Sequence, residues 1–106
     1  MLEFVIKNGG ATINKQGAIV TLKTGYQVSK KDIGKILVQD LTEQMINDII
    51  CYGLKRGEYV GIWIEDGFAY VDISVRIATK KDALQKGVEL NQISIFDWKK
   101  TTCIYC

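Results

Sequence analysis

The chain has 106 residues, of which 47% are hydrophobic and 25% charged, and this balance is typical of one globular domain over residues 1–106. Its 14 Lys and Arg residues nearly cancel 12 Asp and Glu residues, so the net charge of +2 excludes the strong field of a sequence-independent DNA binder or a polyanionic DNA mimic. The absence of histidine excludes the commonest general base and zinc ligand.

Short apolar runs separated by turn residues predict an N-terminal β-meander. Residues 2–6 include β-branched side chains and precede Asn8-Gly9-Gly10, which is a turn signal, so we expect the first strand there. The same pattern continues to Ser29. It predicts strands from Ala11, over residues 18–22 and over residues 26–29, with turns at residues 14–17 and 23–25.

A helix is predicted over residues 41–55, where apolar residues recur at helical spacing. Asp40 stands at the N-cap position and Glu43, three residues later, completes a capping box. Gly57 is expected to be the left-handed cap. The preceding residues, 30–39, fit a short helix or a turn, although part of this segment could be extended.

Residues 58–64 and 68–77 alternate apolar and polar side chains around Asp66-Gly67, a pair that favours the positive φ angles of a tight hairpin. One face of the second strand is aliphatic from Ala69 to Ile77, and we expect it to lie in the core.

Thr79 is predicted to cap a second helix, and Asn91 to stop it in the left-handed conformation. The apolar stripe of this helix comprises Ala83, Leu84, Gly87, Val88 and Leu90. Strands over residues 92–97 and 101–106 complete the chain. The predicted fold is α+β: a mostly antiparallel sheet with two helices packed on it, preceded by the N-terminal β-meander.

Motifs for catalysis or nucleotide binding are absent, because the chain contains neither a P-loop nor a Gly-x-Gly-x-x-Gly run. The neighbouring carboxylates of Glu65 and Asp66 fall in the predicted hairpin loop, where they solvate a turn. We therefore expect no enzymatic activity and no cofactor. No apolar run approaches the length of a membrane span, and no basic signal peptide begins the chain, so we expect a cytoplasmic protein without a membrane partner.

Cys103 and Cys106 form a Cys-x-x-Cys step, which can hold a metal when the intervening residues turn. A closed zinc site needs four ligands, however, and Cys51 is the only further cysteine. In an extended segment, residues three apart also point to opposite faces. We expect no metal site, with one of the pair packed as a small hydrophobe, the other a terminal thiol, and Cys51 in or near the core.

Aromatic side chains gather on strand faces opposite aliphatic ones. The aliphatic faces suffice to dock two helices and carry Val60, Ile62, Ile64, Val71, Ile73, Val75, Ile93 and Ile95. The aromatic faces then look outward, where Trp and Tyr are typical of interface hot spots, or are covered by the meander as a second core. The candidate partner-binding residues are Tyr59, Trp63, Phe68, Tyr70, Phe96 and Trp98.

Nucleic-acid binding is the alternative. Basic dipeptides occur at residues 30–31, 55–56, 80–81 and 99–100, and Phe68 and Tyr70 could stack bases. Only two of the 14 basic residues are arginine, and no dense basic run exists. These limits favour a protein partner over an accessory nucleic-acid-binding role.

Two stretches of the sequence resemble a group of known proteins. Residues 9–17 lead into residues 23–29 as Gly-Gly-Ala-Thr-Ile-Asn-Lys-Gln-Gly and Lys-Thr-Gly-Tyr-Gln-Val-Ser, and Asp82-Ala-Leu leads into residues 91–98. This is similar to small proteins that phages and conjugative elements of low-GC Gram-positive bacteria carry beside their regulatory genes. Some of them are anti-CRISPR inhibitors, so the resemblance implies a protein partner, a CRISPR effector nuclease, and no chemistry of its own.

Overall fold

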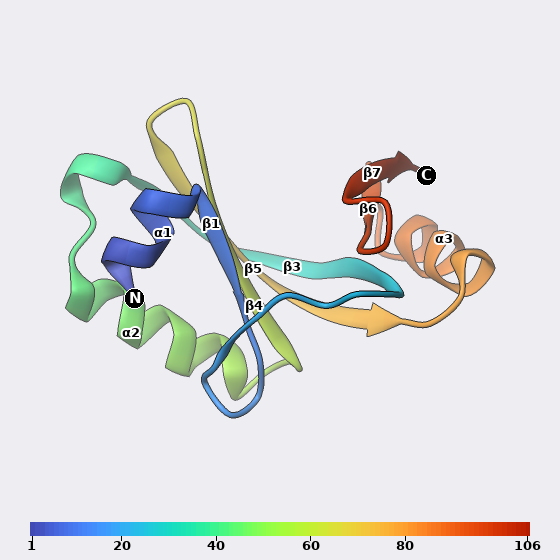
Figure 1. The fold of residues 1–106 in the computed structure, drawn as a ribbon, viewed down its shortest axis with the longest axis horizontal. Helices are drawn as coiled ribbons and strands as arrows, with labels where there is room; N and C mark the ends of the chain where they lie inside the picture. Colours follow the sequence, from blue (N-terminus) through green and yellow to red (C-terminus); the bar gives the residue numbers. More distant parts are fainter.

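Seven strands form one antiparallel sheet that carries three helices (Figure 1). The computed structural model describes residues 1–106. In chain order the elements are α1 (Leu2–Asn8), β1 (Gly10–Ile13), β2 (Ile19–Val20), β3 (Tyr26–Leu37), the short 3₁₀ helix η1 (Val38–Asp40), α2 (Glu43–Leu54), β4 (Tyr59–Glu65), β5 (Phe68–Ile77), α3 (Lys80–Glu89), β6 (Ser94–Asp97) and β7 (Thr102–Tyr105). The predicted α+β class with an antiparallel sheet is confirmed, with three helices in place of two.

The strands lie side by side in the order β2-β1-β4-β5-β3-β6-β7. The β4–β5 hairpin turns at Asp66 and Gly67, whose φ angles of 51° and 79° are both positive, as predicted. The expected hairpin between the strand from Ala11 and the strand over residues 18–22 also forms, as β1–β2. However, β3 pairs with β5 and β6 rather than with β2, so the strand predicted over residues 26–29 lies elsewhere in the sheet and does not complete a meander.

Strand β3 is much longer than predicted, because residues 30–37 continue it where a short helix or a turn was expected. Its pairing with β5 extends over the whole length of both strands and is interrupted by two register shifts. On its other side β3 pairs with β6 only at Tyr26 and Gln27. The rest of that edge, residues 28–37, has no strand partner.

The first segment is a helix, so the strand predicted over residues 2–6 is wrong. One side chain of α1, Val5, is completely buried, and the helix ends at Gly9 in the left-handed conformation with a φ of 77°. The Asn8-Gly9 pair therefore ends a helix instead of a strand. None of the three helices has the length and the apolar run that crossing a bilayer requires.

Helix α2 confirms the predicted amphipathic helix, although its caps differ. The side chain of Thr42, not Asp40, accepts the N-cap hydrogen bond, from the Met45 amide at 3.1 Å. Gly57 has no positive φ. A Cβ atom there would overlap the Ile73 side chain, so glycine at this position allows close packing rather than a left-handed cap.

Helix α3 begins at the predicted cap, where Thr79 accepts a hydrogen bond from the Asp82 amide at 3.3 Å. Ala83 and Gly87 of its apolar stripe are buried, whereas Val88 is exposed. Asn91 follows with a φ of 57°, which confirms the left-handed stop.

Two hydrophobic clusters lie at opposite ends of the β3–β5 ladder. The larger, with nine buried residues, packs under α1 and α2 and includes Val60, Ile62, Ala69 and Val71. The smaller, with three, lies under α3 and consists of Val28, Ala83 and Ile95. The aliphatic face of β5 therefore lies in the core from Ala69 to Ile73, as predicted. Ile93 does not, because it is 79% exposed and lies before β6.

Candidate functional site

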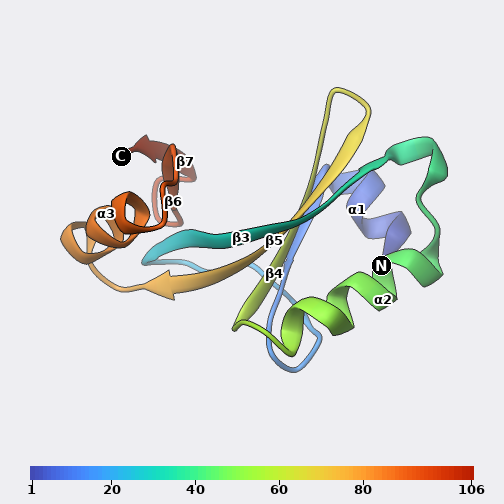
Figure 2. The same ribbon diagram turned by 180° about the vertical axis from the view of Figure 1, so that it is seen from behind.

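The helices pack on one face of the sheet and leave the other face uncovered (Figures 1 and 2). Because side chains alternate along a strand, the residues between the buried ones on β4 and β5 all point to this open face. On β5 it carries Phe68, Tyr70 and Asp72, followed by Ser74, which is buried, and on β4 it carries Trp63 and Gly61. The open face is therefore aromatic and polar.

A groove of about 1010 Å³ runs across this face. Its floor includes Asp32 and Asp72, which are opposite each other on β3 and β5. One wall includes Trp63, and the other includes Phe96 and Trp98. Of the residues that line the groove, Asp32 and Asp72 are the only charged ones, and none is Lys or Arg. The groove is therefore acidic in a chain whose net charge is positive.

Cross-strand pairing builds the first wall. Trp63 lies directly opposite Tyr70, and their rings stack with centroids 5.5 Å apart and planes within 15°. Phe68 adds a tilted contact to Tyr70 at 6.4 Å. The Lys35 Nζ atom lies 4.4 Å from the Phe68 centroid and 5.5 Å from that of Tyr70, in cation–π geometry. Trp63 remains 37% exposed at the end of this stack.

Hydrogen bonds hold the second wall in place. Trp98 donates its indole N–H to Gln27 Oε1 at 2.9 Å, and Gln27 in turn donates to the buried Ser74 Oγ at 2.8 Å. The Phe96 ring meets the Trp98 ring edge to face, with centroids 5.1 Å apart. This chain of contacts ties β6, β3 and β5 together, so the second wall has a fixed orientation.

Burial raises the pKa of Asp72 to about 6, and the nearby Asp32 carboxylate adds to this rise. The Ser29 hydroxyl and the Gly61 backbone oppose it. The hydroxyl is itself buried and has no hydrogen-bond partner of ordinary geometry. Gly61 provides space for the carboxylate, because a Cβ atom there would lie 2.6 Å from Asp72 Oδ1.

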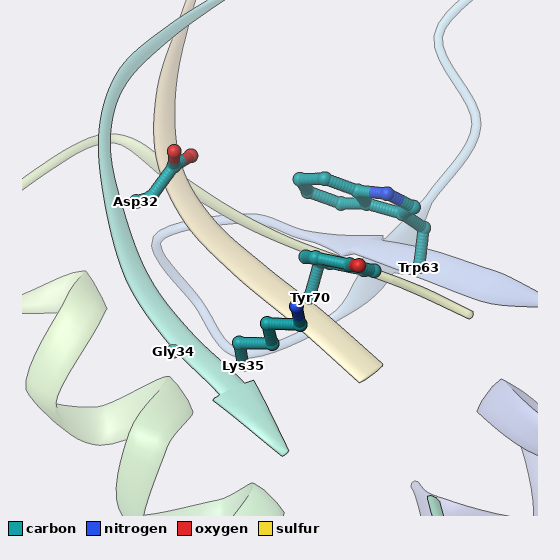
Figure 3. Close-up of a pocket in the computed structure, with 5 residues that line it drawn as sticks. All are labelled: Asp32, Gly34, Lys35, Trp63 and Tyr70. Carbon is teal, nitrogen blue, oxygen red and sulfur yellow. The ribbon is translucent and has the colours of Figure 1, made fainter. Parts of the chain in front are cut away.

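A smaller pocket of about 300 Å³ lies between Asp32 and the aromatic stack, as Figure 3 shows. Its lining comprises Asp32, Gly34, Lys35, Trp63 and Tyr70. The two ion pairs of the chain join Met1 to Glu43 and Lys86 to Glu89, so neither Asp32 nor Asp72 is paired with a cation. Two unpaired carboxylates thus lie beside an exposed indole ring.

The structure brings most of the candidate aromatic residues to this site. Trp63, Phe96 and Trp98 line the groove, Tyr70 lines the smaller pocket, and Phe68 supports Tyr70. The remaining candidate, Tyr59, lies on the open face opposite Ser74, outside the groove lining. Neither hydrophobic cluster contains any of the six, so they do not form the second core that was the alternative.

The cysteines are all free and exposed, so the prediction of Cys51 in or near the core is wrong. Cys103 lines the groove, and Cys106 Sγ lies 2.6 Å from where a Gly87 Cβ atom would be. Cys103 in β7 and Cys106 directly after it therefore lie on opposite sides of the C-terminal segment. The structure contains no group of three or more His, Cys, Asp or Glu side chains that could hold a metal ion.

Comparison of the chain with protein-family models, with curated proteins and with solved structures found no match. The resemblance to mobile-element proteins therefore stays a prediction.

Proposed function

We propose that the chain is a non-catalytic protein-binding domain that receives a segment of its partner in the groove of the open sheet face. The supporting observation is the composition of that groove, which combines aromatic walls, a polar floor and two aspartates without any Lys or Arg. Aromatic side chains that are held in place and half-exposed contribute most of the binding energy in many protein interfaces.

The acidic floor argues against nucleic acid as the occupant. A phosphate backbone is bound through Lys and Arg, and it would meet only Asp32 and Asp72 here. The four basic dipeptides of the chain all lie outside the groove lining. A protein segment that is neutral or basic fits the charge of this surface.

For the class of partner, we propose a bacterial defence nuclease of the CRISPR type, as the resemblance implies. Such enzymes hold nucleic acid in channels rich in Lys and Arg, and an acidic groove is complementary to the rim of such a channel. Adding the purified chain to a cleavage reaction of such a nuclease tests this class. Inhibition that the variant Trp98→Ala relieves supports it, and full cleavage at saturating chain concentration excludes the nuclease tested.

A photo-crosslinking experiment tests the groove itself. The crosslinking amino acid p-benzoylphenylalanine replaces Phe96 in one sample and Tyr52, an exposed aromatic residue on α2, in the control. Each protein is irradiated in a bacterial lysate with and without nuclease treatment. We expect a protein adduct at position 96 that survives nuclease treatment and is absent at position 52. Equal adducts at both positions, or adducts to nucleic acid alone, contradict the proposal.

A further inference from the structure

We propose that the smaller pocket binds an arginine side chain of the partner segment, whose guanidinium group stacks on the Trp63 ring and pairs with Asp32, next to the Asp72 carboxylate of the adjoining groove. This inference rests on the proposed function, and it specifies the chemistry that the groove recognises. It is carried by the shape of the pocket, by its charge and by the aromatic surface beside it.

The pocket has room for one long side chain. Its volume of about 300 Å³ is roughly ten times the share of one liquid water molecule. Figure 3 shows the Trp63 ring lying over Tyr70 and extending toward the side of the pocket where Asp32 lies. Gly34 contributes only backbone to this lining, because a Cβ atom there would point to the core face and lie 3.7 Å from the Val71 side chain. A planar group can therefore enter along the indole face and reach the carboxylate.

Two carboxylates, Asp32 in the pocket lining and Asp72 beside it in the groove, favour a cation here. Asp32 and Asp72 are cross-strand neighbours of like charge, an arrangement that destabilises a sheet, and no cation of the chain pairs with either. The only basic residue in the pocket lining, Lys35, lies on the Phe68 side of the stack. A guanidinium from outside would offset the repulsion between the two carboxylates.

Arginine fits this pocket better than lysine. Its planar guanidinium stacks on aromatic rings and can donate two parallel hydrogen bonds to a carboxylate, whereas the lysine ammonium is a compact and strongly hydrated point charge. A stacked indole next to a carboxylate matches both properties of the guanidinium.

Three short peptides test the inference: acetyl-Gly-Val-Arg-Val-Gly-amide and its lysine and citrulline versions. Citrulline has the shape of arginine without its charge. Nuclear magnetic resonance follows the indole N–H signal of Trp63, and the backbone amide signals of α3, which lines neither the pocket nor the groove, serve as the internal reference. We expect the arginine peptide to shift the Trp63 signal and to bind roughly tenfold more tightly than the citrulline peptide, because its hydrogen bonds are charge-assisted.

Variants of the aspartates provide the matched comparison. Asp32→Asn and Asp72→Asn are expected to weaken binding of the arginine peptide by roughly tenfold each. Asp66→Asn removes the same charge from the β4–β5 turn, outside both pockets, and should bind as the unchanged chain does. Equal binding of the arginine and citrulline peptides, no binding of any peptide, or equal effects of the three variants would overturn the inference.

The two proposals fail in different ways. If the crosslink at position 96 persists while the arginine peptide shows no preference, the groove binds a protein and the arginine pocket is wrong. If the crosslink is absent while the arginine peptide binds at Trp63, the pocket recognises a guanidinium and the protein-binding role of the whole groove is wrong.

Discussion

At the scale of single residues, two aspartates show opposite relations to the fold. Asp97 is buried, and its carboxylate accepts hydrogen bonds from the amides of Lys99 and Lys100 at 3.0 and 3.2 Å. Asp72 is partly buried beside a second carboxylate, and burial raises its pKa to about 6. The Asp97 carboxylate stabilises a turn, whereas the Asp72 carboxylate is ionised at a position where burial disfavours charge.

The raised pKa predicts that Asp72→Asn stabilises the protein above pH 6. An acid whose pKa is higher in the folded than in the unfolded state lowers stability as the pH rises through the interval between the two values. Here that interval extends from 3.8 to about 6 and corresponds to a loss of roughly 2–3 kcal/mol in the free energy of unfolding. Urea unfolding at pH 4 and pH 8 measures the stability of the variant and of the unchanged chain. We expect the variant to be more stable at pH 8 and equally stable at pH 4.

The variant Asp66→Asn, at an exposed position, serves as control. Its free energy of unfolding should change between pH 4 and pH 8 by the same amount as that of the unchanged chain. A loss of stability in Asp72→Asn that is equal at pH 4 and pH 8 would show that the carboxylate holds its neighbours by hydrogen bonds, and it would contradict the prediction.

At the scale of the elements, the N-cap of α2 gives a second prediction. Thr42→Ala removes the side-chain oxygen that accepts from the Met45 amide, so we expect a loss of about 1 kcal/mol in the free energy of unfolding. Asp40→Ala, the matched change at the position that the sequence indicated, should have almost no effect because Asp40 lies in η1. Chemical denaturation of both variants measures this, and a larger loss in Asp40→Ala would contradict the assignment.

Elements with a strong local signal were predictable. The Asp66-Gly67 turn and the Thr79 cap are specified by neighbouring residues, and both appear as predicted. Residues 2–6 and 30–37 carry mixed signals, and tertiary packing decides them. Burial of Val5 favours a helix over residues 2–6, and pairing with the long strand β5 keeps residues 30–37 extended.

The candidate site was predictable only in part, for the same reason. Alternation on β4 and β5 placed Trp63 and Tyr70 on one face from the sequence alone. Asp32 and Asp72 are 40 positions apart and become neighbours only through the β3–β5 register, with a register shift on each side of Asp32. With residues 30–37 not recognised as a strand, no local pattern could bring the two carboxylates together.

At the scale of the whole molecule, unequal cores predict unequal local stability. The end with α1 and α2 has nine buried residues in its cluster, whereas the end with α3, β6 and β7 has three. Regions with few buried apolar contacts open more readily. We expect the backbone amides of β6 and β7 to exchange hydrogen faster than those of β4 and β5. Native-state hydrogen exchange measures this, and equal protection of both pairs would show that the sheet opens as one unit.

The free edge of β3 has a consequence for how the protein behaves at high concentration. Exposed backbone N–H and C=O groups along residues 30–37 are a template for strands of other molecules. Lys30, Lys31 and Lys35 are exposed along this stretch, and two register shifts distort it. Positive charge and an irregular backbone both discourage edge-to-edge aggregation. The same residues that interrupt a regular strand pattern in the sequence thus protect an unpaired strand from amyloid-like association.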